Sequence, residues 1–277
     1  MGLTAGSVEM PEPAPSTDPF AGLRGRERQI TFHDAAAIGG APVAYVVVLA
    51  TVIAVLSFIP FSIVLSGGSS FPMAQGVYSL NGWILGPWAG GVASGIGALV
   101  GVLLAPHTAG IPWLSVTGAS LSALVAAALH PTGRRRFAGG ISALILSGWI
   151  LFYYQAVVLN GVAAGVFFLS YTTHLISTLL FLSPARRWIG RALRSPDLKR
   201  VAIGLFLGTW IAASLMMFYM SWLSYAILTW PEEVFYIFFV MVPLENAARS
   251  VIGAVIGTGV IAGLRSMELV KPPEANF

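Results

Sequence analysis

The chain has 277 residues, 56% of them hydrophobic and only 9% charged, a composition that excludes an ordinary soluble domain because too few polar groups remain to cover its surface. Its net charge of +4 does not indicate nucleic-acid binding, because most arginines and lysines flank apolar runs, where they act as signals of membrane orientation. The absence of cysteine excludes disulfides, thiolate metal ligands and cysteine nucleophiles.

The apolar runs predict an all-α polytopic membrane bundle of about eight transmembrane helices, because a helix needs about 20 apolar residues to cross a bilayer. Residues 1–38 are expected to be a flexible cytoplasmic tail with a basic flank, since they are Pro-rich and lack the apolar run of a signal peptide. Residues 39–265 form the transmembrane domain, and 266–277 form a cytoplasmic tail. The predicted spans are 42–65, 73–86, 88–105, 113–130, 138–159, 164–182, 201–228 and 234–264.

The distribution of charge between the spans predicts their orientation, because cytoplasmic loops carry an excess of Lys and Arg. The basic connections are the flank with Arg24, Arg26 and Arg28, the triplet Arg134–Arg136, residues 186–200 and residues 265–271. The connections 67–76, 106–112 and 160–161 contain no Lys or Arg, and 230–233 is acidic. We therefore expect a multi-pass protein of the cell inner (plasma) membrane with both termini in the cytoplasm.

One break in this pattern is required by the charge count. Residues 77–104 could form a single helix, but a single crossing would place the Arg134–Arg136 triplet outside the cell. Gly86-Pro87 supplies the break, because proline lacks an N–H and disfavours helix at the residue before it. The second span is then only 73–86, and a short helix below an outer loop is a place where a cavity can form.

Polar residues within the apolar spans are the main candidates for a binding site, because an unpaired charge costs about 2.5–3.5 kcal/mol at the centre of a membrane helix. Glu245 and Arg249 have i, i+4 spacing, so they can form an ion pair, either as a purely structural bridge or as a pair that faces a substrate with Asn246. Polar residues at similar depth and aromatic residues toward the outer side complete the candidate substrate-binding set: Asn81, Trp113, Tyr153, Gln155, Asn160, Glu245, Asn246 and Arg249.

Small residues at spacing four are expected where helices pack closely. The third span contains Gly90, Gly91, Gly95, Gly97 and Gly101, for which internal packing is the simplest interpretation. The first span carries Ala50 and Ala54. This pair is suited either to internal packing or to docking onto another membrane protein.

The run from FPMAQGVYSLNGWILGPWAGG to LVAAAL (71–129) resembles the N-terminal half of a substrate-binding S component of energy-coupling factor (ECF) transporters. The shared features are a short second helix ending in Leu85-Gly86-Pro87, a Gly-rich third helix, a small-residue fourth helix and a basic loop. Ala50 and Ala54 stand where that family docks onto its coupling subunit, and VPLENAARSVIGAVIG resembles its final helix. The family has six helices, so the resemblance implies a six-helix core with an extra pair in the segment 161–229.

The resemblance implies a membrane-embedded binding subunit for uptake of a vitamin-like small molecule, captured from outside beneath 67–76 and 106–112. A separate transmembrane coupling protein and cytoplasmic ATPases would supply energy, and the chain itself has no phosphate-binding loop. The resemblance implies neither an enzyme nor a cofactor, and His107 and His174 lack the companions of a metal site. The alternatives are a sensory or scaffold module that binds ligand without transport, and an intramembrane serine protease that uses Ser94 and His174.

Overall fold

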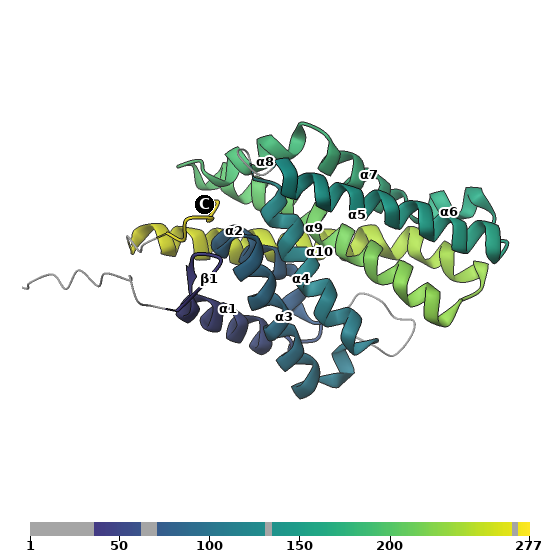
Figure 1. The fold of residues 1–277 in the computed structure, drawn as a ribbon, viewed down its shortest axis with the longest axis horizontal. Coiled ribbons are helices and arrows are strands. Elements are labelled where there is room, and N and C mark those ends of the chain that lie inside the picture. Colours follow the sequence, from purple (N-terminus) through teal and green to yellow (C-terminus); the bar gives the residue numbers. More distant parts are fainter. Residues whose placement is uncertain (1–35, 62–70, 131–134, 268–270) are drawn as a thin grey trace, which may run out of the picture. The chain divides into compact units, whose positions relative to one another are not determined.

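The computed structural model describes residues 36–61, 71–130, 135–267 and 271–277. The predicted N-terminal tail up to residue 35, with Arg24, Arg26 and Arg28, lies outside the described residues, as do Arg134 and the first part of the loop 67–76. Within the described ranges the fold is all-α apart from two short antiparallel strands, β1 (Ala37–Ile38) and β2 (Ala41–Pro42), which form a hairpin before the first helix (Figure 1).

Each predicted span contains a helix. The helices and helical turns are α1 (Val43–Leu56), η2 (Met73–Gly76), α2 (Tyr78–Leu85), α3 (Pro87–Leu104), η3 (Pro106–Thr108), α4 (Pro112–Ala128), α5 (Arg135–Tyr153), its π-helical continuation η4 (Tyr154–Leu159), α6 (Ala164–Ser170), α7 (Thr172–Leu182), α8 (Ala185–Leu193), α9 (Leu198–Leu228) and α10 (Glu232–Ser266). The predicted helical class is therefore confirmed.

Among the described residues, four helices are long and apolar enough to cross a membrane: α3, α5 with its extension (Arg136–Leu159), α9 and α10. The bent pair α6 and α7 would make a fifth if it crosses as one span. The apolar helices α1 and α4 have 14 and 17 residues, and α2 has only 8. Helix length and composition thus support a membrane protein with four or five spanning helices, and the count of eight stays a prediction.

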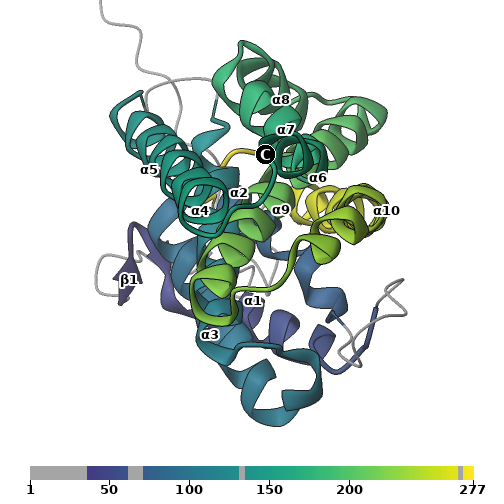
Figure 2. The ribbon, with the colours of Figure 1, turned by 90° about the vertical axis from the view of Figure 1, so that its right-hand side faces the viewer.

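The predicted break at Gly86-Pro87 is confirmed. Gly86 adopts φ 84° and ψ −176°, a backbone conformation that favours glycine, and Pro87 is the first residue of α3. Every residue of α2 is buried, and Figure 2 shows α2 and α9 in the middle of the bundle, with α1 and α3 on one side and α7 and α8 on the other. The neighbouring helices therefore shield the short helix completely.

Two predicted spans differ from the observed helices. The first span was predicted to extend from 42 to 65, but α1 ends at Leu56. Pro60 explains this, because it disfavours helix at Ile59, whose carbonyl accepts a hydrogen bond from Met73 N at 2.9 Å. The sixth span bends by 66° between α6 and α7. There the hydroxyl of Thr172 bonds to the carbonyl oxygens of Phe168 and Leu169, which competes with the helical ladder.

The small residues of α1 and α3 pack against each other. Ala50 and Ala54 are 7% and 8% exposed, and a Cβ atom built on Gly97 would lie 2.5 Å from the carbonyl oxygen of Ala50. This contact brings the two backbones together at a point where only glycine fits. The structure thus places Ala50 and Ala54 on the internal face of α1, which is the packing alternative.

The close contact between α1 and α3 gives a stability prediction. We expect Gly97→Ala to lower the melting temperature of the detergent-solubilised protein, because the new methyl group meets backbone, and overpacking costs about 1–3 kcal/mol. Gly259→Ala in α10 is the matched control, since nothing lies within 4 Å of its Cβ position. The control is expected to be neutral or slightly stabilising, and equal losses in the two variants would contradict the packing argument.

Candidate functional site

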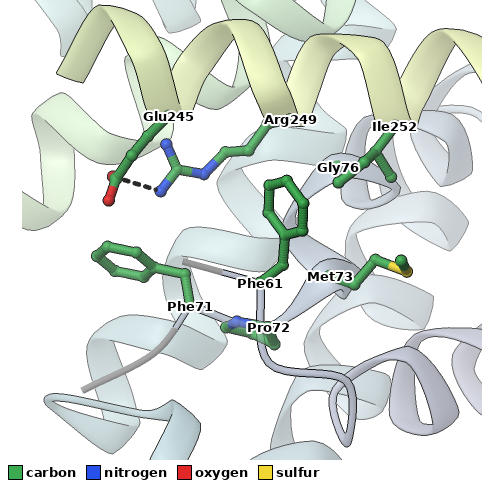
Figure 3. Close-up of a pocket in the computed structure, with 8 residues that line it drawn as sticks. All are labelled: Phe61, Phe71, Pro72, Met73, Gly76, Glu245, Arg249 and Ile252. Carbon is green, nitrogen blue, oxygen red and sulfur yellow. Dashed lines mark hydrogen bonds and ion pairs between the residues drawn. The ribbon is translucent and has the colours of Figure 1, made fainter. Parts of the chain in front are cut away.

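A buried ion pair on α10 forms the centre of the candidate site. Arg249 Nη2 lies 3.0 Å from Glu245 Oε2, and the two residues are 3% and 6% exposed. Their i, i+4 spacing places both on one side of the helix, which is the arrangement expected from the sequence. Figure 3 shows them, with Ile252 one turn further on, projecting from α10 toward the segment that precedes η2.

The segment before α2 supplies the partners of this pair. Gln75 in η2 accepts a hydrogen bond from Arg249 Nε at 2.8 Å, and the guanidinium carbon of Arg249 lies 5.0 Å from the centre of the Phe71 ring. The close approach depends on Gly76, where a Cβ atom would lie 2.7 Å from Ile252 Cγ2 and 2.9 Å from the carbonyl oxygen of Arg249. Glycine here allows η2 to lie directly on α10, so Gln75 can reach the guanidinium.

The hydrogen-bonding capacity of this cluster is incompletely used. Arg249 Nη1 and Glu245 Oε1 are buried and have no hydrogen-bond partner among the described residues. The neighbouring Asn246 donates from Nδ2 to the carbonyl oxygen of Trp210 at 3.0 Å, while its Oδ1 is also unpartnered. Buried polar atoms without partners are costly, so a free donor beside a free acceptor indicates a place where another molecule can bind.

A small pocket lies against the pair. Its lining combines the α10 face with the segment before α2: Phe61, Phe71, Pro72, Met73, Gly76, Glu245, Arg249 and Ile252 (Figure 3). The cavity volume is about 10 Å³, which is close to the room that one water molecule needs. Phe61 N donates a hydrogen bond to Phe71 O at 2.6 Å, which joins the two chain segments of this wall. In this state the pocket is closed to anything larger than water.

A second cavity of about 10 Å³ lies near the same turn, and its lining includes Gln75 and Tyr78. Thr108 and Ala109 also contribute to it, and both belong to the connection 106–112. Residues from this connection and from η2 therefore meet at one cavity. Described residues of both connections, 67–76 and 106–112, line this cavity, and these are the connections beneath which the resemblance implies substrate capture.

Five of the predicted binding residues lie away from the pair. Asn81 is 1% exposed and donates to Ser94 Oγ at 3.0 Å, which ties α2 to α3. Trp113 is exposed at the start of α4, and Tyr153 packs on Phe167 and Phe168 in an aromatic cluster. Asn160 is exposed and donates to the carbonyl oxygen of Gln155, whose side chain is half-buried. None of the five lines the pocket at Arg249.

Gln75 is the site residue that the sequence did not single out. It lies in the predicted span 73–86, where an amide side chain among apolar residues is itself a signal, and it is 5% exposed. Its role depends on the position of η2 against α10, a contact between residues 174 positions apart. Only the tertiary structure shows this contact.

The alternative that relied on Ser94 and His174 gains no support from their contacts. Ser94 accepts from Asn81 and donates to the carbonyl oxygen of Tyr78 at 3.2 Å. His174 Nδ1 lies 3.0 Å from Ser214 Oγ, and its Nε2 has no partner among the described residues. A serine–histidine pair in which the base contacts the nucleophile is thus not formed by these two residues.

Because Glu245 and Arg249 are buried together, we expect the melting temperature of the protein to depend strongly on both residues. Arg249→Ala leaves the Glu245 carboxylate buried alone, and breaking such a pair costs about 3–5 kcal/mol. The double variant Glu245→Leu, Arg249→Met removes both charges and is expected to recover most of this loss, measured as melting temperature in detergent. A double variant as unstable as Arg249→Ala would contradict this reading of the pair.

The comparisons with known proteins add no assignment to this geometry. No protein-family model, no curated protein and no solved structure matches the chain. The functional argument therefore rests on the residues and contacts of the chain itself.

Proposed function

We propose that the chain is a membrane-embedded substrate-binding subunit for uptake of a vitamin-like small molecule, of the S-component type of ECF transporters. The observation that carries the proposal is the buried Glu245–Arg249 pair beside a pocket, in which Arg249 Nη1 and Glu245 Oε1 have no hydrogen-bond partner among the described residues. A purely structural bridge would be expected to use these atoms within the protein. A binding site needs them free.

The chemistry of the pair suggests the kind of ligand. Arg249 Nη1 offers a donor, Glu245 Oε1 offers an acceptor, and their charges cancel. A molecule without net charge that carries an acceptor next to a donor, such as a cyclic amide or urea, would satisfy both atoms. Phe61 and Phe71 add flat apolar walls to the pocket. We therefore expect an uncharged, partly apolar ring compound.

Entry of such a ligand requires the pocket to widen. The hydrogen bonds Phe61 N to Phe71 O and Met73 N to Ile59 O join the two sides of the wall opposite α10. Separation of 59–61 from 71–73 would open the pocket without moving α10. If α1, α2 and α4 also cross the bilayer, giving the eight crossings expected from the charge pattern, this wall faces the outside of the cell.

The proposed uptake requires partners, because the sequence contains no phosphate-binding loop. We propose a transmembrane coupling protein with cytoplasmic ATPases. Ala50 and Ala54 are occupied by α3, so the docking surface is assigned instead to the exposed side of α1 formed by Val47, Thr51 and Val55. This side carries the i, i+4, i+8 spacing of a single helix face.

Native mass spectrometry tests the binding site. The wild-type protein purified from its native membranes should carry a small molecule, and the variant Glu245→Leu, Arg249→Met should lose it while it keeps most of its stability. The reason is that the variant lacks the donor and acceptor but fills a similar volume. Retention of the same mass by the variant, or a wild-type protein free of any small molecule, would count against the site.

Co-purification tests the uptake role. The wild-type chain should bring down a membrane protein and ATPases, whereas Val47→Trp and Val55→Trp should reduce this yield on the order of tenfold through steric blocking. Ile150→Trp on α5 is the control, because Ile150 is also an exposed apolar side chain, at 69%. A wild-type protein that retains ligand but captures no ATPase would instead indicate a sensory or scaffold module.

A further inference from the structure

An apolar groove elsewhere in the fold shares no lining residue with the pocket at Arg249. Its volume is about 350 Å³. Its lining combines residues of α1, α2, α10 and the C-terminal segment, including Val48, Val52, Ile84, Val260, Leu264 and Phe277. The lining contains almost no polar atoms, so a polar ligand would lose its hydrogen bonds there.

The C-terminal residues Pro272 and Phe277 contribute to the lining of the groove. Asn276 N donates to the carbonyl oxygen of Trp83 at 2.7 Å, and Asn276 Oδ1 accepts from Arg194 Nε at 2.7 Å. A Cβ atom on Gly40 would lie 3.4 Å from Pro273, so the C-terminal residues lie beside the hairpin that precedes α1. Phe277 is only 8% exposed and is therefore held as a fixed wall.

Two cationic side chains contact the C-terminal residues that adjoin the groove. Lys271 is exposed, and its Nζ donates to Phe277 O at 2.9 Å and lies 4.9 Å from the centre of the Phe277 ring. The ammonium group has three donors, so others are available to a second acceptor. Arg194, whose Nε donates to Asn276 Oδ1, is also exposed.

The dimensions of the groove select a narrow occupant. An α-helix with its side chains is about 10–12 Å across, so a few turns of a partner helix exceed this volume several-fold. A single hydrocarbon chain is thin enough to lie along α1 from Tyr45 to Val52, a rise of about 10 Å. A negative group at its end would then meet Lys271.

We propose that this groove binds one acyl chain of an anionic membrane phospholipid, whose headgroup lies beside Lys271. The site is separate from the proposed substrate pocket and does not depend on the uptake function. An acyl chain here contacts α1, α10 and the C-terminal residues together. Its occupancy therefore links the end of the chain to the first helix.

The experiment measures lipid binding by native mass spectrometry on delipidated protein, with dioleoyl phosphatidylglycerol as the probe and dioleoyl phosphatidylcholine for comparison. Val52→Trp and Val260→Trp fill the groove from opposite walls and should weaken phosphatidylglycerol binding on the order of tenfold. Ile150→Trp and Val255→Trp are the controls, because both side chains are 69% exposed and neither lines the groove. The control variants should bind as the wild type does.

Two further variants test the C-terminal residues Lys271 and Phe277. Lys271→Gln should remove the preference for phosphatidylglycerol over phosphatidylcholine. Phe277→Ala should weaken the binding of both lipids, because it removes an aromatic ring from the lining of the groove. Equal binding of the two lipids by the wild type, unchanged binding in Val52→Trp and Val260→Trp, or equal losses in the controls would each overturn the proposal. Size-exclusion elution matching the wild type establishes that the variants are folded.

Discussion

The burial of one short helix is the constraint on which the rest of this structure depends. The eight residues of α2 have no exposed side, so each neighbouring helix must offer small groups where it meets them. A Cβ atom on Gly82 would collide with the carbonyl oxygen of Ala123, and one on Gly90 would lie 2.5 Å from the carbonyl oxygen of Asn81. Such contacts fix α3 and α4 around α2 through van der Waals packing of backbones, which is the main attraction available between helices in lipid.

The candidate site follows from this arrangement. Because α2 is held in the centre, the turn η2 that precedes it lies against α10 at Gly76, and Gln75 is carried to the guanidinium of Arg249. Arg249 then has one hydrogen-bond partner on its own helix, Glu245, and one on η2, Gln75. A charge pair in an apolar bundle is stable only when its hydrogen bonds are largely satisfied, so the turn and the pair support each other. Arg249 and Glu245 line the pocket together with Gly76 of η2 and with Phe61.

Much of this fold could be predicted from the sequence, because the signals are local. Apolar runs bounded by glycine, proline and charge mark each helix, and Gly86-Pro87 marks the corner between α2 and α3. The i, i+4 spacing of Glu245 and Arg249 likewise predicts their pairing. Local signals fail where a competing contact decides the outcome. Pro60 ends α1 early, and the hydroxyl of Thr172 accompanies the bend between α6 and α7.

The site was less predictable, because the position of a residue within an apolar span does not show which neighbouring helix its side chain faces. Asn81 and Arg249 are both polar residues within apolar helices, yet Asn81 ties α2 to α3 and Arg249 faces a pocket. The sequence marks Gln75 only as an amide among apolar residues, and this does not identify its partner. Its place is set by close backbone contact at Gly76, and that contact is visible only when α10 is present.

The faces of α1 show how one short helix can serve several contacts without conflict. At about 100° per residue, Ala50 and Ala54 point toward α3, Val48 and Val52 point into the apolar groove, and the remaining side is open. The internal contact cannot be exchanged for a partner, because Gly97 already touches the backbone of Ala50. A coupling protein of the proposed kind would therefore have to approach the open side, next to the groove. An acyl chain in the groove would then lie at the edge of that interface, where it supports the position of α1 and does not compete with the partner.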